Sequence, residues 1–380
     1  MARAYLDHAS SSPPRPEAIR AVRDWFELPG ADPGRLHEEG RINRDALEHA
    51  RQEVAALVGA SPREVVFTSG ATEAINDAVW GATRAHRDAP VLCAAVEHSA
   101  VRDASDRLAP VETLPVDGEG RIDVDALAAR LASRSLLRPA LVHCQWANHE
   151  VGTLQPVARA VALCRDAGVT VHVDAAAACG HVPVNLTELG ADLVSVSAHK
   201  LGGVPGAGAL VVRRGSRFDP LIVGGEQERG RRGGLEALPA LLAFGAAAGA
   251  LAADDALATE AKTARAQIAA VVEDALAVQA VEIVGPASPD ERLPHLVCLG
   301  VHGVEAEPVL IGLDRAGVGV HSGSACSSES IEPSPVLEAM GVDPSHSLRV
   351  SVGWSTSDKE IAAFGDAFVR VVAELRALRR

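Results

Sequence analysis

Short apolar runs alternate with helix-like segments between residues 64 and 215 of the 380-residue chain. The six runs are EVVFTSG, APVLCAAVEH, ALVHCQWANHE, VTVHVDAAA, ADLVSVSAHK and GALVVRRG. Continuous apolar runs of this length, separated by segments such as PVARAVALCRDAG, are typical of strands buried on both faces of a parallel sheet. The pattern therefore predicts an α/β domain with a mainly parallel sheet covered by helices.

The last third of the chain follows a different pattern. An Ala-rich segment, residues 238–278, predicts one long helix that leads out of the α/β region. After it come the strand candidates HLVCLGV, GVGVHSGSA and SLRVSVG, the helix candidate EAEPVLIGLDRAG, and a final helix from about residue 357. This mixed order predicts a second, smaller α+β domain at the C-terminus.

Composition and charge narrow the class of protein. A hydrophobic content of 47% with 23% charged residues fits a soluble globular protein. An aromatic content of 3% and a net charge of −14 argue against direct binding of nucleic acid. The six cysteines form no CxxC pair, so we predict neither a metal site nor a disulfide framework. The sequence shows no targeting pattern and no apolar stretch of membrane-spanning length, so we expect a cytoplasmic protein that does not bind membranes.

Two residues at strand ends have side chains suited to covalent cofactor chemistry. Lys200 ends an apolar run and precedes the glycine-rich LGGVPGAG. A lysine that forms a Schiff base needs a backbone that lets a flat cofactor approach; the alternative is a solvated lysine before a loop. Asp174 ends another run, where it suits the pyridinium nitrogen of pyridoxal phosphate. Its alternative is a loop aspartate satisfied by backbone amides.

Other strand ends carry weaker signals that point to the same edge of the sheet. In FTSGATEAIN, Ala71 and Thr72 open a helix whose free N–H groups suit a phosphate, although many ordinary turns look alike. His98 could stack on a flat cofactor, or it could be a structural histidine with satisfied hydrogen bonds. Asn148 could bond a ring hydroxyl or a substrate, or it could serve its own turn.

The stretch HSGSACSSES places Cys326 among small polar residues. A free cysteine usually behaves as a small core hydrophobe, yet this one has no apolar neighbours in the sequence. Gly, Ser and Ala are typical of an exposed loop rather than of a core segment. Cys326 is therefore a candidate reactive thiol.

Taken together, these blocks resemble the cysteine desulfurases of the NifS/IscS type, which are class V pyridoxal-phosphate enzymes. The resemblance covers YLDHASSSP, TSGATEAIN, VEHSAV, NHEVGTLQP, HVDAAA, SVSAHK, GGEQERGRRGG, HSGSACSS and SLRVSVG. It implies the type I fold: a large domain with a mainly parallel seven-stranded sheet, expected at residues 15–255. Residues 1–14 and 256–380 are expected to form the small domain, which carries the cysteine loop.

The resemblance also implies a role for each candidate residue. Lys200 would hold pyridoxal phosphate and act as a base. Asp174 would face its ring nitrogen, and His98 would stack on its ring and serve as a candidate proton acceptor. The remaining cofactor-binding positions are Ala71, Thr72, Ser197 and His199. Asn148 and Arg349 match the substrate-binding positions, and a bidentate guanidinium suits a carboxylate. Cys326 would take the sulfur of L-cysteine as a persulfide, release alanine and pass the sulfur to an acceptor protein.

Two departures from the family pattern remove polar contacts to the cofactor. Ala177 stands where the family usually has glutamine, and Leu235 stands where it usually has threonine. The resemblance further implies a homodimer, in which GGEQERGRRGG reaches the partner subunit. The alternatives are another class V enzyme, such as a selenocysteine lyase, a C–S lyase or an aminotransferase, or a catalytically silent paralogue. An exposed cysteine argues against a plain aminotransferase.

Overall fold

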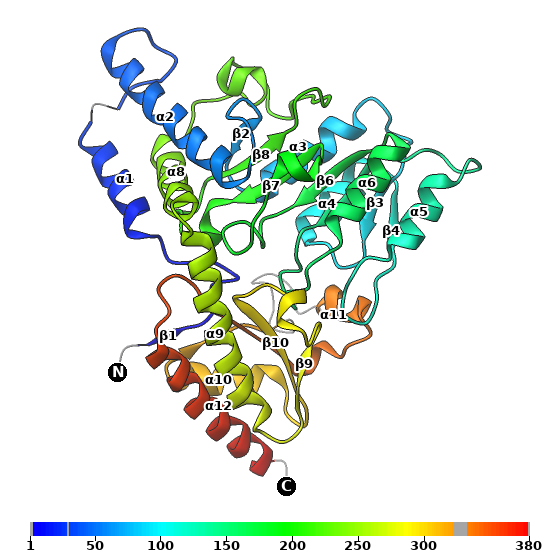
Figure 1. The fold of residues 1–380 in the computed structure, drawn as a ribbon, viewed down its shortest axis with the longest axis vertical. Helices are drawn as coiled ribbons and strands as arrows, with labels where there is room; N and C mark the ends of the chain where they lie inside the picture. The colour runs from blue at the N-terminus through cyan, green and yellow to red at the C-terminus, as the bar shows by residue number, and fades with distance from the viewer. Residues whose placement is uncertain (1–2, 29, 323–332, 379–380) are drawn as a thin grey trace.

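A seven-stranded sheet forms the centre of the larger part of the molecule (Figure 1). The computed structural model describes residues 3–28, 30–322 and 333–378. The strands are β2 (Val65–Thr68), β3 (Val91–Ala94), β4 (Val111–Leu114), β5 (Leu141–Gln145), β6 (Thr170–Asp174), β7 (Leu193–Ser197) and β8 (Gly208–Val212). Their order is β2-β8-β7-β6-β5-β3-β4. Strand β8 is antiparallel to both neighbours and the other pairs are parallel. The predicted mainly parallel sheet of seven strands is confirmed.

Helices cover both faces of this sheet. They are α1 (Pro16–Phe26), α2 (Glu38–Leu57), α3 (Ala71–Thr83), α4 (Ser99–Leu108), α5 (Val124–Ala132), α6 (Val157–Ala167), α7 (Leu186–Leu189) and α8 (Leu238–Ala252). Alternate residues of β7 pack on opposite faces: Leu193 belongs to a cluster with Ala74 and Ala78 of α3, whereas Val194 and Val196 belong to the main core. Two covered faces explain why the strands read as continuous apolar runs.

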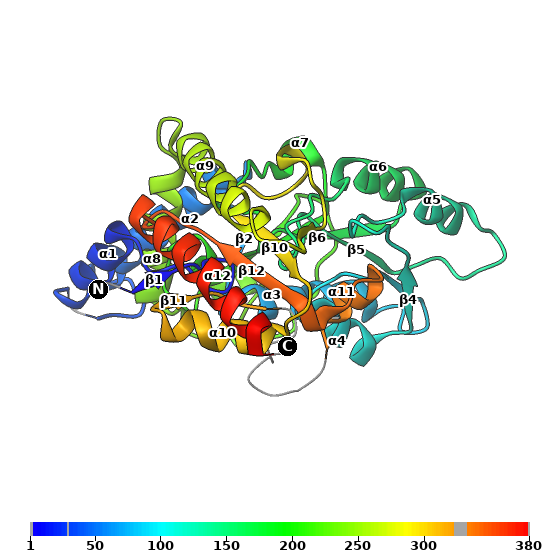
Figure 2. The same ribbon diagram turned by 90° about the horizontal axis from the view of Figure 1, so that it is seen from below.

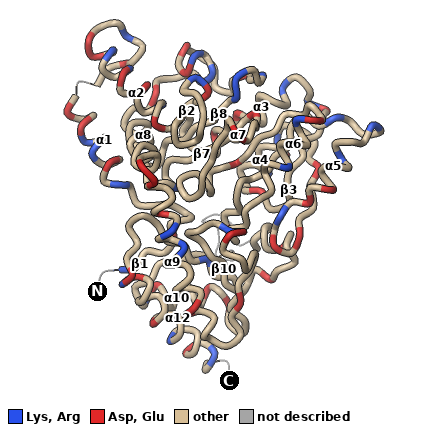
Figure 3. The backbone as a smooth tube through the Cα atoms, in the orientation of Figure 1, with Lys and Arg blue, Asp and Glu red and all other residues tan. Residues whose placement is uncertain are grey.

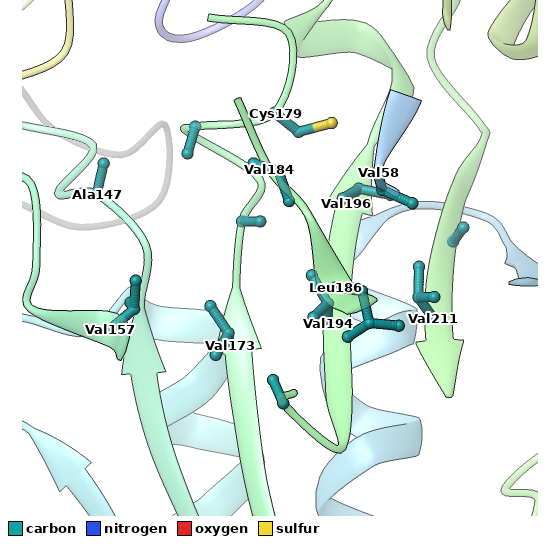
Figure 4. Packing of buried hydrophobic residues seen from close by; sticks show 14 of the residues in the cluster. Val58, Ala147, Val157, Val173, Cys179, Val184, Leu186, Val194, Val196 and Val211 are labelled. Carbon is teal, nitrogen blue, oxygen red and sulfur yellow. The ribbon is translucent and has the colours of Figure 1, made fainter. Parts of the chain in front are cut away.

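The main core lies between the sheet and the helices α2, α6 and α8, which cover one of its faces. Figure 4 shows Val173, Val194, Val196 and Val211 of the sheet together with residues of neighbouring segments, Val58 and Leu186 among them. Each fully buried valine or leucine side chain contributes about 1.5–3 kcal/mol to the free energy of unfolding. This packing makes the sheet a rigid support for the side chains at its strand ends.

The smaller part of the molecule combines a three-stranded antiparallel sheet with helices (Figure 2). The sheet has the order β12-β10-β9, with β9 (Val281–Val284), β10 (Leu296–Val301) and β12 (Ser347–Ser351). A two-stranded parallel sheet joins β1 (Ala4–Tyr5) to β11 (Val318–Gly319). The helices are α9 (Ala256–Leu276), α10 (Ala306–Arg315), α11 (Pro335–Ala339) and α12 (Asp358–Leu378), and α9, α10 and α12 bury a second core. The predicted smaller α+β region is present.

The exact domain boundaries, residues 15–255 against 1–14 with 256–380, stay a prediction. Most apolar residues after position 256 belong to the second core, but Leu296, Cys298 and Met340 belong to the core of the larger part. Acidic and basic residues are interspersed over both parts (Figure 3). The net charge of −14 is therefore spread over both parts rather than confined to one.

Two expectations about elements were wrong. The long helix predicted at 238–278 is two helices, α8 and α9, which meet at 81°. Asp255 between them has left-handed backbone (φ 54°), and α9 turns there to pack on α12. Strand β4 was not predicted, because it is an edge strand that includes Glu112 and in which Leu114 is the one buried residue.

No single helix in the described ranges is both long and apolar enough to cross a membrane. The bent pair α8 and α9 passes that test of length and composition only when the two helices are taken together.

Candidate active site

A cavity of about 500 Å³ lies at the edge of the large sheet where the parallel strands end. Strand ends supply Gln145, Asp174 and Ser197 to its wall, one from each of three neighbouring parallel strands. This is the edge at which ligands bind in open α/β sheets. The cavity brings together most of the residues predicted from the sequence: Ala71, Thr72, His98, Asp174, Ser197, His199, Lys200 and Arg349.

Two hydrogen-bond donors hold the carboxylate of Asp174 in place, and part of this carboxylate faces the cavity. The backbone N–H of Ala176 donates to Oδ1 at 3.0 Å, and the Ser195 hydroxyl donates to the same oxygen at 2.9 Å. The residue is 8% exposed and lines the cavity. Because both of these contacts fall on one oxygen, the other oxygen is suited to a cationic partner such as a pyridinium nitrogen.

Helix α3 starts at the cavity with Ala71 and Thr72, after an abrupt turn at Gly70. The turn lies against β8 so closely that a Cβ at Gly208 would be 2.6 Å from the Gly70 backbone. The N-terminus of a helix presents unpaired N–H groups and a positive dipole end, and Thr72 adds a hydroxyl. The Ser197 hydroxyl lies 2.8 Å from Nδ1 of His199 on the same cavity wall.

Lys200 follows β7 in a short 3-10 helix, η1 (Ala198–Lys200). Burial lowers the pKa of its ammonium group, and Arg349 lowers it further, whereas Asp174 and Asp7 oppose the shift. A lowered pKa increases the fraction of neutral amine, which is the form that acts as nucleophile or base. The electrostatics of the site therefore suit covalent and proton-transfer chemistry at this nitrogen.

Two of the glycines that follow Lys200 pack closely against other parts of the protein. A Cβ at Gly202, which has φ +90°, would lie 2.5 Å from Cγ of Arg15. A Cβ at Gly203 would lie 2.9 Å from Cβ of Ala198. Gly202 and Gly203 therefore make room for Arg15 and Ala198.

His98 caps the N-terminus of α4 and lines the cavity. Its Nδ1 accepts a hydrogen bond of 3.1 Å from the backbone N–H of Ala100, so in the neutral ring the proton lies on Nε2. Burial lowers the pKa of His98, and Lys200 lowers it further. The ring is therefore predominantly neutral and can take up a proton during a reaction.

Arg349 is 5% exposed and reaches the cavity from β12. Its Nη2 donates to Oδ1 of Asp7 at 2.8 Å and to the hydroxyl of Ser10 at 2.5 Å, while Nη1 donates to the carbonyl oxygen of His149 at 2.9 Å. Within the described part of the chain, its buried Nε has no hydrogen-bond partner. An orphaned guanidinium donor inside a cavity is an unused binding capacity for an anion.

Asn148 is the one predicted site residue in the described ranges that does not line this cavity. It is fully buried, and its amide oxygen accepts from the N–H groups of Glu150 and Val151 at 2.8 and 2.9 Å. Its amide nitrogen donates to the carbonyl oxygen of Val96 at 3.2 Å. The side chain therefore stabilises its own turn, which was the alternative considered from the sequence. Cys326 lies outside the described residues.

Two histidines that were not predicted also line the cavity, His149 and His321. The ring centroid of His149 lies 4.9 Å from that of His98. Burial lowers the pKa of His149, and burial together with Arg349 lowers the pKa of His321 to about 4. His149 lies in NHEVG and His321 lies in HSGSAC, which are parts of two blocks that carry the family resemblance. Their positions next to Asn148 and near Cys326 could have indicated that they line the site.

Glu97 lies behind the cavity wall and is completely buried. Its Oε1 accepts from the backbone N–H of Gln145 at 2.8 Å, and its Oε2 has no hydrogen-bond partner in the described ranges. Burial, with Asp174 nearby, raises the pKa of Glu97 from 4.5 to about 8. Between pH 4.5 and 8 the folded protein keeps the Glu97 proton, whereas the unfolded chain releases it. The free energy of unfolding therefore falls as pH rises toward 8.

We therefore expect Glu97→Gln to become more stable relative to the wild type as pH rises from 6 to 9, because the amide has no proton to lose. The melting temperature of Glu97→Gln relative to that of the wild type should rise by about 2 °C or more over this pH range, because 1 kcal/mol moves the midpoint of a larger domain by about 2–4 °C. Thermal unfolding at each pH measures this difference. The exposed Glu374→Gln is the control, and a Glu97→Gln difference that does not vary with pH would contradict the assignment.

The comparisons with known proteins agree with this fold. Residues 4–364 match the family model Aminotransferase class-V. The chain is 38% identical to a cysteine desulfurase of Cereibacter sphaeroides, over 100% of this chain and 98% of that protein. It is 35% identical to the cysteine desulfurase IscS of Dictyoglomus turgidum, over 98% and 95%. A solved structure titled NIFS-LIKE PROTEIN superimposes with a TM-score of 0.89 at 27% identity, covering 98% of this chain and 100% of that one.

The chain belongs to the class V aminotransferase family and, within it, to the cysteine desulfurases of the NifS/IscS type. Members of this family are pyridoxal-phosphate enzymes. The recognition made from the sequence blocks and the predicted type I fold are confirmed.

Proposed function

We propose that this protein is a pyridoxal-phosphate-dependent cysteine desulfurase that converts L-cysteine to L-alanine and carries the sulfur as a persulfide on Cys326. The observation that supports it most is the single cavity that joins a buried lysine, an aspartate, a histidine and an arginine: Lys200, Asp174, His98 and Arg349. The relatives at 35–38% identity over nearly the full chain carry the same activity in their names.

The residues of the cavity fit the cofactor. The N-terminus of α3 with Thr72, and the hydroxyl of Ser197 with His199, form a set of neutral donors suited to a phosphate. Asp174 supplies the anionic partner for a ring nitrogen. Lys200 is the residue that would hold the cofactor covalently. When bound, pyridoxal phosphate supplies an electron sink for the charge left on the substrate α-carbon.

Two sequence positions that lack the usual polar residue have different surroundings. Ala177 lines the cavity, so its methyl group takes the place of a polar contact there. Leu235 is 62% exposed and Val223 is 75% exposed, and both lie in the region expected to reach a partner subunit. These exposed apolar side chains support the proposed homodimer, because burial against a second copy would remove them from water.

Each step of the proposed reaction is assigned to one side chain of this protein. Arg349 binds the substrate carboxylate through its guanidinium, of which Nε is unused. Lys200, whose pKa burial lowers, removes the α-proton as the neutral amine. His98, with Nδ1 occupied by the Ala100 N–H, exchanges a proton through Nε2. Cys326 attacks the substrate sulfur as a thiolate, forms an S–S bond while the C–S bond breaks, and the released carbon takes a proton to become alanine.

The experiment that tests this function measures both products. Purified protein supplied with pyridoxal phosphate and L-cysteine should release L-alanine, and without a reductant each alanine should correspond to one sulfur retained on protein. With a reductant, sulfide should appear in equal amount. Pyruvate and ammonia in place of alanine would identify a different C–S lyase, and keto acid without loss of sulfur would identify an aminotransferase.

We expect Arg349→Gln to raise KM for L-cysteine by about 10–100-fold, with a smaller change in kcat. A hydrogen-bonded charge pair with a substrate contributes about 1.5–3 kcal/mol, which corresponds to this range. Steady-state kinetics of alanine release measure it. Exposed Arg20→Gln serves as the control, and an unchanged KM in Arg349→Gln would assign the carboxylate to another residue.

A further inference from the structure

A second cavity, of about 140 Å³, lies next to the active-site cavity. We call it the lysine chamber and define it by six of its lining residues: Ser12, Gly180, His181, Lys200, His295 and Gly353. Among the described residues, Lys200 is the one that lines both cavities. The chamber therefore reaches the proposed catalytic lysine from a second direction.

Two stacked histidines form part of the chamber wall. The ring centroids of His181 and His295 are 3.4 Å apart, and their planes differ by 14°. His181 is hydrogen-bonded to the backbone of Lys200. Burial lowers the pKa of both rings, to about 3 for His181, and His181 lowers the pKa of His295 further. At neutral pH both rings are uncharged, so each has one nitrogen that donates and one that accepts.

His295 carries an unused hydrogen-bonding atom. The residue is 2% exposed, yet its Nδ1 has no hydrogen-bond partner among the residues that the structure describes. An unsatisfied buried polar atom costs about 1–3 kcal/mol unless a water molecule pairs with it. A cavity of 140 Å³ with His181, His295 and Lys200 in its wall is many times the space of about 10–15 Å³ that one water needs. Water in the chamber is the simplest way to satisfy this nitrogen.

The chamber also reaches the surface of the molecule. Helix α9 contributes Thr259 and Thr263, which are both exposed and both line the chamber. At the same side Glu260 accepts two hydrogen bonds of 2.6 Å from Arg15, so that this carboxylate is paired. His8, whose ring contacts the hydroxyls of Ser12 and Thr356, packs close by. Polar groups therefore extend from the surface at α9 to Lys200.

We propose that the lysine chamber is a water-filled route through which Lys200 exchanges protons with solvent, with His295 as a positioning residue for that water. This inference rests on the proposed function, in which Lys200 takes the α-proton of the substrate. The proton passes from the substrate α-carbon to the Lys200 nitrogen, and from there to a chamber water. A solvent proton returns along the same route, so that charge and atoms balance.

The route predicts that hydrogen at the α-carbon comes from solvent. In D₂O, the protein loaded with pyridoxal phosphate should exchange the α-hydrogen of added L-alanine, which ¹H NMR follows without any sulfur chemistry. His295→Phe keeps a stacked ring but removes both nitrogens, and we expect it to slow this exchange about tenfold. His295→Gln, which keeps polar atoms, should recover most of the rate. Exposed His302→Phe is the matched control and should exchange like the wild type.

A measurement without cofactor separates this role from a structural one. A crystal structure of the unloaded wild-type protein should show a water within hydrogen-bond distance of Nδ1 of His295, and His295→Phe should lack it while keeping its fold. A dry chamber, or equal exchange rates in wild type and His295→Phe, would overturn the proposal. Alanine exchange without desulfuration of cysteine would contradict the proposed function but leave the proton route supported.

Discussion

Lys200→Ala is expected to abolish turnover of L-cysteine, with a loss of at least about 10³-fold, because one side chain supplies both the covalent attachment and the base. The fold should persist, since the substitution removes an ammonium group whose burial is unfavourable, as its lowered pKa indicates. Circular dichroism and the rate of alanine release measure the two effects. Because Asp174 and the N-terminus of α3 are unchanged, weak non-covalent binding of the cofactor should remain.

The chain offers a sharp control for this result. It has three lysines, Lys200, Lys262 and Lys359. Treatment with pyridoxal phosphate followed by borohydride should label the peptide that contains Lys200, and mass spectrometry should find the other two unlabelled. Exposed Lys262→Ala should match the wild type in both labelling and turnover. Label on Lys262 or Lys359 alone, or full activity in Lys200→Ala, would remove Lys200 from its proposed role.

Much of the candidate site could be predicted from strand ends. Parallel strands finish at one edge of a sheet, so residues that follow apolar runs meet even when they are far apart in sequence. Asp174, His98 and Lys200 are brought together in this way. Runs that are buried on both faces identify such strands clearly, whereas the half-exposed edge strand β4 gave no comparable signal.

Side-chain direction was less predictable than position along the chain. Asn148 and His149 are neighbours in one turn, yet His149 lines the cavity and Asn148 points its amide into the backbone of that turn. Turn geometry decided this, and residue type did not reveal it. Ser10, from the block YLDHASSSP, contacts Arg349, a pairing across 339 positions that no local pattern indicates.

The bend between α8 and α9 shows a similar limit. Alanine-rich sequence favours helix on both sides of Asp255, so propensity alone predicted one element. Packing instead requires α8 to contact α1 and α2, and α9 to contact α12. The two surfaces lie in different directions, and the left-handed Asp255 provides the change of direction.

Cys326→Ser is expected to stop sulfur transfer while leaving cofactor binding intact, because serine is nearly isosteric but cannot form a persulfide. Alanine release from L-cysteine should fall at least about 10³-fold, and α-hydrogen exchange of L-alanine should continue. Ser327→Ala, at the next position, controls for a change in the same stretch of sequence and should remain active. Equal alanine release by Cys326→Ser and wild type would make the thiol incidental.

The other cysteines provide an internal control for where the sulfur is carried. Cys93, Cys144, Cys164, Cys179 and Cys298 are free and buried. Burial raises the pKa of every one of these thiols, to about 12 for four of them, so they stay protonated and poorly nucleophilic at neutral pH. Wild-type protein given L-cysteine without reductant should therefore gain one sulfur on the peptide that contains Cys326. Sulfur on any of the five buried cysteines would show that burial does not protect them, and that another thiol carries the sulfur.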